Sequence, residues 1–93
     1  MIVLACKLTF FLPYSSSLKD KRRLRRQWTD RLAKRVLLKE VATQESHQIL
    51  TLGFALVSLR EADVQQQLRD LTDDMLTSGE LELHSSDWDL IKL

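Results

Sequence analysis

Two long apolar runs, residues 2–12 and 49–59, constrain the fold more than any other feature of the chain. In the first run both sets of alternating positions are mostly apolar, which is typical of a central strand with both faces largely covered. Pro13 cannot donate a hydrogen bond to a neighbouring strand, so the first strand ends there. The second run has smaller side chains on one face and large ones on the other, namely Leu50, Leu52, Phe54 and Leu56.

A helical pattern follows the first run. Ser17 and Asp20 have the spacing of a capping box, with Asp in place of the usual Glu or Gln. From this start we expect a helix that ends near Arg35, whose charge suits the negative end of the helix dipole. Its buried side is an apolar stripe in which residues recur every four positions: Leu24, Trp28, Leu32 and Val36.

A second helical pattern follows the second run. Ser58 and Glu61 predict another capping box, and Gly79 lies where a left-handed residue closes a helix. Weaker strand patterns occupy residues 37–42 and 81–93. The element order is therefore β-α-β-β-α-β. It predicts a single α+β domain over residues 1–93, a ferredoxin-like plait with a four-stranded antiparallel sheet and both helices on one face.

Composition argues against most catalytic functions. The chain has no Asn, and its one cysteine, Cys6, lies in a strand pattern with no evident base beside it. His47 and His84 are far apart in sequence and lack partners at metal-ligand spacing. We therefore predict no enzyme activity, catalytic residue, metal or cofactor, and no motif indicates a small-molecule substrate.

No run is long enough to span a membrane and residues 1–12 lack the features of a signal peptide, so we expect a cytoplasmic protein.

The formal net charge of +1 hides a strong asymmetry. Residues 18–35 contain nine basic and two acidic side chains, whereas residues 60–93 contain three basic and nine acidic ones. Clustered cations can neutralise phosphates and release counterions, which gives affinity for nucleic acid without sequence preference. The alternative is a solvated face that balances the acidic half. The candidate phosphate-binding residues are Lys19, Lys21, Arg22, Arg23, Arg25 and Arg26.

The apolar face of the second long strand provides a competing hypothesis. With both helices on one side of the sheet, we place Leu50, Leu52, Phe54 and Leu56 on the other side. If it stayed exposed, such a row would be a hydrophobic patch that promotes association with other molecules. It therefore predicts a homodimer, a protein–protein interaction module that does not bind nucleic acid.

The segment Ser17-Leu18-Lys19-Asp20-Lys21-Arg22 resembles the signature of the YlxP-like family, small bacterial proteins of unassigned biochemical function. The resemblance continues through Glu40-Val41 and residues 52–58, and it departs from the family pattern at residues 42–48. It implies a ferredoxin-like fold. Because the genes of such proteins often lie beside those of translation initiation factor two and ribosome-binding factor A, it also implies a role in ribosome assembly or translation. The leading hypothesis is a non-catalytic protein that binds RNA or a ribosomal particle through its basic helix.

Overall fold

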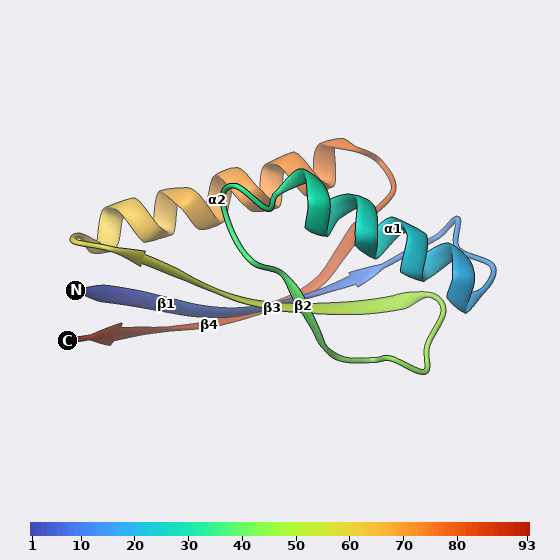
Figure 1. The fold of residues 1–93 in the computed structure, drawn as a ribbon, viewed down its shortest axis with the longest axis horizontal. Coiled ribbons are helices and arrows are strands. Elements are labelled where there is room, and N and C mark those ends of the chain that lie inside the picture. Colours follow the sequence, from blue (N-terminus) through green and yellow to red (C-terminus); the bar gives the residue numbers. More distant parts are fainter.

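The computed structural model describes residues 1–93 and contains two helices on one face of a four-stranded sheet (Figure 1). The strands lie in the order β2-β3-β1-β4 and all neighbouring pairs are antiparallel. This arrangement is an α+β ferredoxin-like plait, so the predicted fold is confirmed. The elements are β1 (Ile2–Phe11), α1 (Leu18–Arg31), β2 (Lys39–Ala42), β3 (Ile49–Ser58), α2 (Glu61–Thr77) and β4 (Glu82–Lys92).

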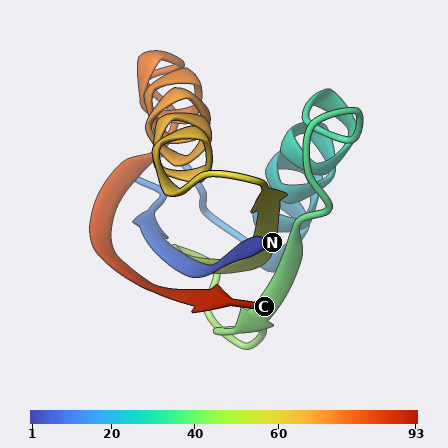
Figure 2. The same ribbon diagram turned by 90° about the vertical axis from the view of Figure 1, so that its left-hand side faces the viewer.

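The core lies between the helices and the two central strands. Alternate residues of β1 are buried, because every second side chain of a strand points to the same face. The antiparallel register pairs Leu8 with Leu52 and Cys6 with Phe54, which places the buried rows of β1 and β3 on one face. Both helices stand above this face and apart from each other (Figure 2).

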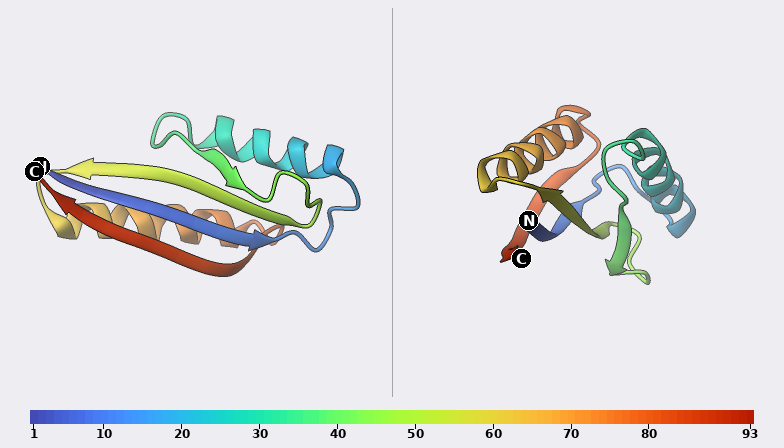
Figure 3. Two further views of the ribbon diagram at one scale, coloured as in Figure 1. Left: turned by 90° about the horizontal axis from the view of Figure 1, so that it is seen from below. Right: turned by 60° about the vertical axis from the view of Figure 1, so that its left-hand side comes forward.

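The sequence-based placement of Leu50, Leu52, Phe54 and Leu56 is wrong. All four are buried beneath the helices within one chain, so none of them is available to a partner. The opposite row of β3 includes Gly53, Ala55 and Val57, which are half-exposed or exposed. No helix lies over that face of the sheet (Figure 3, left). Burying the larger side chains removes more apolar area from water, which explains why the sheet turns that face to the helices.

On the uncovered face, a residue of β2 packs closely against β3. A Cβ added to Gly53 would lie 2.6 Å from Cγ1 of Val41, so the absence of a side chain at this position lets Val41 lie across the strand. The face carries small residues near its middle and half-exposed branched residues around them, with Val41 and Val57 among them. It is therefore open and partly apolar.

Several element boundaries differ from the predicted ones. Helix α1 ends at Arg31, four residues before Arg35, although Val36 beyond it is still buried. The N-cap of α2 is Arg60, and Ser58 instead donates a hydrogen bond to Asp63 at 3.1 Å, so the second capping box is wrong.

The end of α2 is as predicted, because Gly79 has a left-handed φ of 76°. Strand β4 is one continuous strand with a register shift opposite Thr9 and Phe10. Neither helix has the length and apolar character needed to cross a bilayer.

The two faces of β3 should respond differently to truncation. We expect Leu52→Ala to lower the free energy of unfolding by about 2–5 kcal/mol, because it leaves a cavity in the core. Val57→Ala, on the uncovered face of the same strand, should cost less than about 1 kcal/mol. Urea denaturation of both variants measures the difference. Equal losses would contradict the assignment of the two faces.

Candidate nucleic-acid interface

Helix α1 begins at a closely bonded turn. The Ser17 hydroxyl accepts a hydrogen bond from the Asp20 backbone N–H at 3.1 Å, as the capping pattern predicts. The Asp20 carboxylate, however, accepts from the hydroxyl and backbone N–H of Ser16, at 2.7 and 3.0 Å, one residue before the expected partner. These bonds, the hydroxyl first, lower the pKa of Asp20, and the nearby Arg23 charge adds to the effect.

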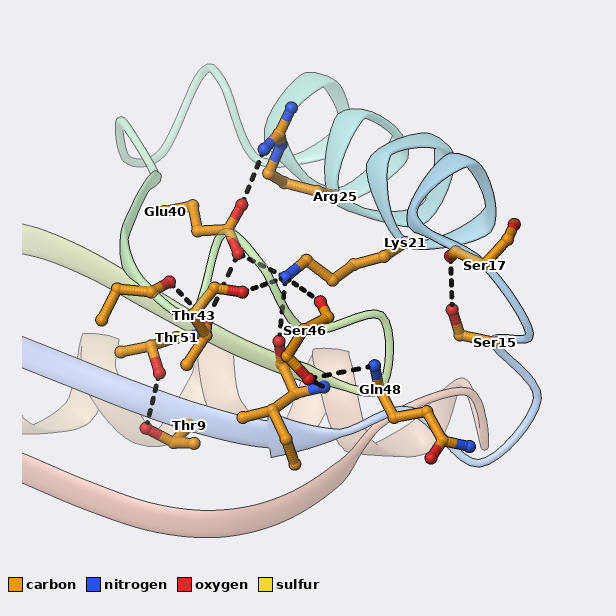
Figure 4. Close-up of polar contacts among 12 residues, drawn as sticks. Thr9, Ser15, Ser17, Lys21, Arg25, Glu40, Thr43, Ser46, Gln48 and Thr51 are labelled. Carbon is orange, nitrogen blue, oxygen red and sulfur yellow. Dashed lines mark hydrogen bonds and ion pairs between the residues drawn. The ribbon is translucent and has the colours of Figure 1, made fainter.

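Lys21 is the most deeply buried charged residue of the basic cluster, with 1% of its side chain exposed. Its ammonium lies 2.7 Å from the Glu40 carboxylate and donates hydrogen bonds to the backbone carbonyls of Thr43, Ser46 and Ile49 (Figure 4). These acceptors satisfy a buried cation, which would otherwise be strongly unfavourable. Lys21 joins α1 to β2 and to the β2–β3 connection, and it is not available to a phosphate.

Arg25 lies one turn after Lys21 and contacts the same carboxylate. Its guanidinium donates to Glu40 at 2.7 Å, and only 4% of the Glu40 side chain is exposed (Figure 4). Burial raises the pKa of Glu40, but the hydrogen bonds and charges of Lys21 and Arg25 outweigh it and hold the pKa below the ordinary value of 4.5. The stabilisation from this carboxylate is therefore present above pH 4.5 and is lost as the pH falls through its depressed pKa.

The β2–β3 connection is held in an unusual conformation beside this cluster. Thr43 has a φ of 69°, which is rare for a β-branched residue. Its carbonyl accepts from Lys21 and its hydroxyl accepts from the Thr51 backbone N–H at 3.0 Å. These contacts, from a helix and from a strand, keep the residue in this conformation. The β2–β3 connection is therefore fixed to α1.

Two further arginines of the basic segment are paired with α2. Arg31 and Arg35 contact the two carboxylate oxygens of Asp74 at 2.9 and 3.1 Å. The Arg31 guanidinium also lies 4.8 Å from the centre of the Trp28 ring, a cation–π contact. Part of the charge asymmetry of the sequence is thus balanced within the fold, as the alternative hypothesis expects.

Four candidates remain exposed, and they share one face of α1. The side chains of Lys19, Arg22, Arg23 and Arg26, which we call the outer basic face, are spaced so that they fall within an arc of about 100° on the helix. Their only ion pair is a long one, 3.9 Å from Arg23 to Asp20. Together with Asp20 they line a surface hollow of about 350 Å³. The arrangement is suited to bind an extended anion.

Sequence reasoning thus identified the cluster but did not separate its two sides. A usable signal was present: Lys21 precedes Leu24 by three residues and Trp28 by seven, which places it on the apolar stripe. The identity of its partner, Glu40, had no comparable signal, because that contact depends on how β2 lies against the helix.

The cysteine and the two histidines do not form a catalytic or metal-binding arrangement. Burial and the nearby Asp87 charge raise the pKa of the Cys6 thiol from 9.0 to about 11, so it is protonated at neutral pH and a poor nucleophile. His47 and His84 are both exposed. No group of three or more His, Cys, Asp and Glu side chains is placed to hold a metal ion. Nothing in this arrangement positively indicates catalysis.

The fold and this surface define a small α+β domain of the ferredoxin-like type with a polybasic helix. The profile of a family described as "Protein of unknown function (DUF503)" matches residues 3–88, and the chain belongs to that family. A comparison with curated proteins finds no match. The family description assigns no activity, and the narrower YlxP-like resemblance stays a prediction. The function must therefore be inferred from the surface of the molecule.

The buried lysine should be far more important for stability than its exposed neighbour. We expect Lys21→Met to lower the free energy of unfolding by about 3 kcal/mol, because it leaves a buried carboxylate and three carbonyls without their shared donor. Lys19→Met, two residues away and exposed, should change it by less than about 0.5 kcal/mol.

Denaturation at neutral and acidic pH measures both effects. The cost of Lys21→Met should shrink as the pH falls through the depressed pKa of Glu40, because a neutral carboxyl no longer needs a cationic partner. Similar stability of the two variants at neutral pH would show that the buried cluster contributes little.

Proposed function

We propose that this protein binds RNA through the outer basic face of α1. The observation that carries the proposal is that four cations of the helix stay exposed on one side, although the fold pairs four others internally. A surface whose only role was to balance the acidic half would not need to gather its free cations in one arc. Helical geometry spreads the four over about 10 Å along the axis, which suits successive phosphates of one strand.

The binding site is held in place before any ligand arrives. The capped start of α1 and the Lys21–Glu40–Arg25 cluster fix the helix against the sheet, so the outer side chains project from a rigid support. The cluster therefore contributes to the site indirectly. The outer basic face contacts the phosphates of the RNA, and contacts to phosphates carry no sequence information. On the basis of the resemblance to YlxP-like proteins, we propose that this RNA binding acts in ribosome assembly or translation in the cytoplasm.

Charge reversal tests this function. We expect the triple variant Arg22→Glu, Arg23→Glu, Arg26→Glu to bind a structured RNA at least tenfold more weakly at low salt. If about three phosphate contacts are lost, the slope of log K against log salt should fall by about two. Fluorescence anisotropy at several salt concentrations measures both quantities.

The control for that experiment carries the same change of net charge elsewhere. Lys34→Glu, Lys39→Glu, Arg69→Glu alters three exposed residues outside the outer basic face. We expect this variant to retain most of the affinity. An equal loss in both variants would mean that net charge alone drives binding, and a wild-type protein that does not bind RNA at low salt would refute the proposal.

We also propose a second candidate function, self-association through the uncovered sheet face. The face contains a shallow, largely apolar hollow of about 500 Å³ that extends from Val41 and Gly53 across Lys7 to Asp87 and Asp89. Lys7 lies directly across from Asp87 in the register of β1 and β4. In a two-fold dimer each Lys7 could meet the acidic residues of the other copy, so the face is complementary to itself.

An oligomeric-state measurement tests the dimer. We expect sedimentation equilibrium to show dimers at micromolar concentration, and Val57→Glu to convert them to folded monomers, because it places a charge on the contact face. Leu59→Glu, just beyond β3 at an even more exposed position, is the matched control and should leave the dimer intact. A wild-type protein that is monomeric at these concentrations would exclude this function.

A further inference from the structure

Tyr14 is a large aromatic residue that the fold leaves almost entirely in water. Its side chain is 81% exposed, and its hydroxyl has no hydrogen-bond partner in the protein. By contrast, Leu12 before the start of α1 and Trp28 near its end are both buried. An exposed aromatic ring beside a basic surface is a feature that packing does not account for.

The turn that carries Tyr14 is well fixed. Leu12 is fully buried and its backbone N–H donates to the Gln48 carbonyl at 2.8 Å. Ser15, on the other side, is also buried, and its backbone N–H donates back to the Leu12 carbonyl at 3.2 Å. The Ser15 hydroxyl donates to the Ser17 carbonyl at the start of α1. The ring therefore projects from a backbone anchored on both sides, which reduces the entropy lost when a ligand binds it.

The ring lies next to the outer basic face. Tyr14 lines a small hollow of about 120 Å³ together with Arg23 of that face and the polar side chains of Gln27 and Glu80. Arg23 and Asp20 line both this hollow and the larger basic one, so the two are adjacent. A ligand could place phosphates on the arginines and still reach the ring.

We infer that the RNA bound by this protein is single-stranded, and that one unpaired base stacks on Tyr14. This inference rests on the proposed function and names the kind of RNA that the site takes. Proteins bind unpaired bases by stacking them on exposed aromatic rings, whereas the bases of a duplex are already stacked on each other. The phosphates flanking the unpaired base lie on Arg22, Arg23 and Arg26. Gln27 and Glu80 then face the edge of the stacked base, where an amide and a carboxylate can hydrogen-bond to it.

The test compares a short single-stranded RNA with a duplex of the same sequence. Tyr14→Ala should weaken binding of the single strand about tenfold or more and leave duplex binding within twofold, because only the single strand offers a free base face. Tyr14→Phe should retain the wild-type affinity, since it keeps the ring. Trp88→Ala removes a half-exposed aromatic on β4, away from α1, and should have no effect.

A spectroscopic signal distinguishes stacking from a general loss of contact. A single strand that carries 2-aminopurine should show fluorescence quenching on binding wild type and Tyr14→Phe, and little quenching with Tyr14→Ala. If the wild type binds single strands and Tyr14→Ala binds them equally well, the inference is overturned and RNA binding stands. If the charge-reversed variant and the wild type both fail to bind either RNA, the proposed function itself fails and takes this inference with it.

Discussion

The buried contact between Lys21 and Glu40 is the interaction on which the rest of this structure depends. One ammonium joins the basic helix to the second strand through a carboxylate and to the following connection through three backbone carbonyls. Buried ion pairs add little net stability compared with apolar residues of the same shape, but they tolerate no loss of a partner. The contact therefore specifies where α1 lies and which conformation the β2–β3 connection adopts.

This contact divides the basic helix into a side that is paired within the fold and a side that is exposed. The inner cations, Lys21 and Arg25, neutralise one carboxylate that has almost no access to water. Near the end of the helix, Arg31 and Arg35 share Asp74 of α2. The outer cations have no such partners at close range, and Tyr14 extends their surface with an exposed ring. A helix that looks uniformly basic in sequence thus has one side paired within the fold and one side of exposed cations.

The candidate site could be predicted in part. Periodicity and capping located the start of α1 and its apolar stripe, and the charge count identified the helix that carries the exposed cations. The error over Leu50, Leu52, Phe54 and Leu56 had a definite cause. Alternation separates the two faces of a strand but does not say which face the helices cover, since that depends on crossover geometry and on the area each face can bury. The inner and outer cations were not separated for a related reason: the sequence does not show that Glu40 lies under α1.

The sequence by itself determined the element order, the plait topology and the concentration of positive charge in one helix, because these follow from local periodicity, turn residues and connection rules. Only the tertiary structure decided which charges are paired and which are free. Pairing depends on distances between residues far apart in the chain, such as the 2.7 Å between Lys21 and Glu40. Tertiary packing also decided which face of the sheet is core and which is surface, because burial is a property of the packed layers and not of any one strand.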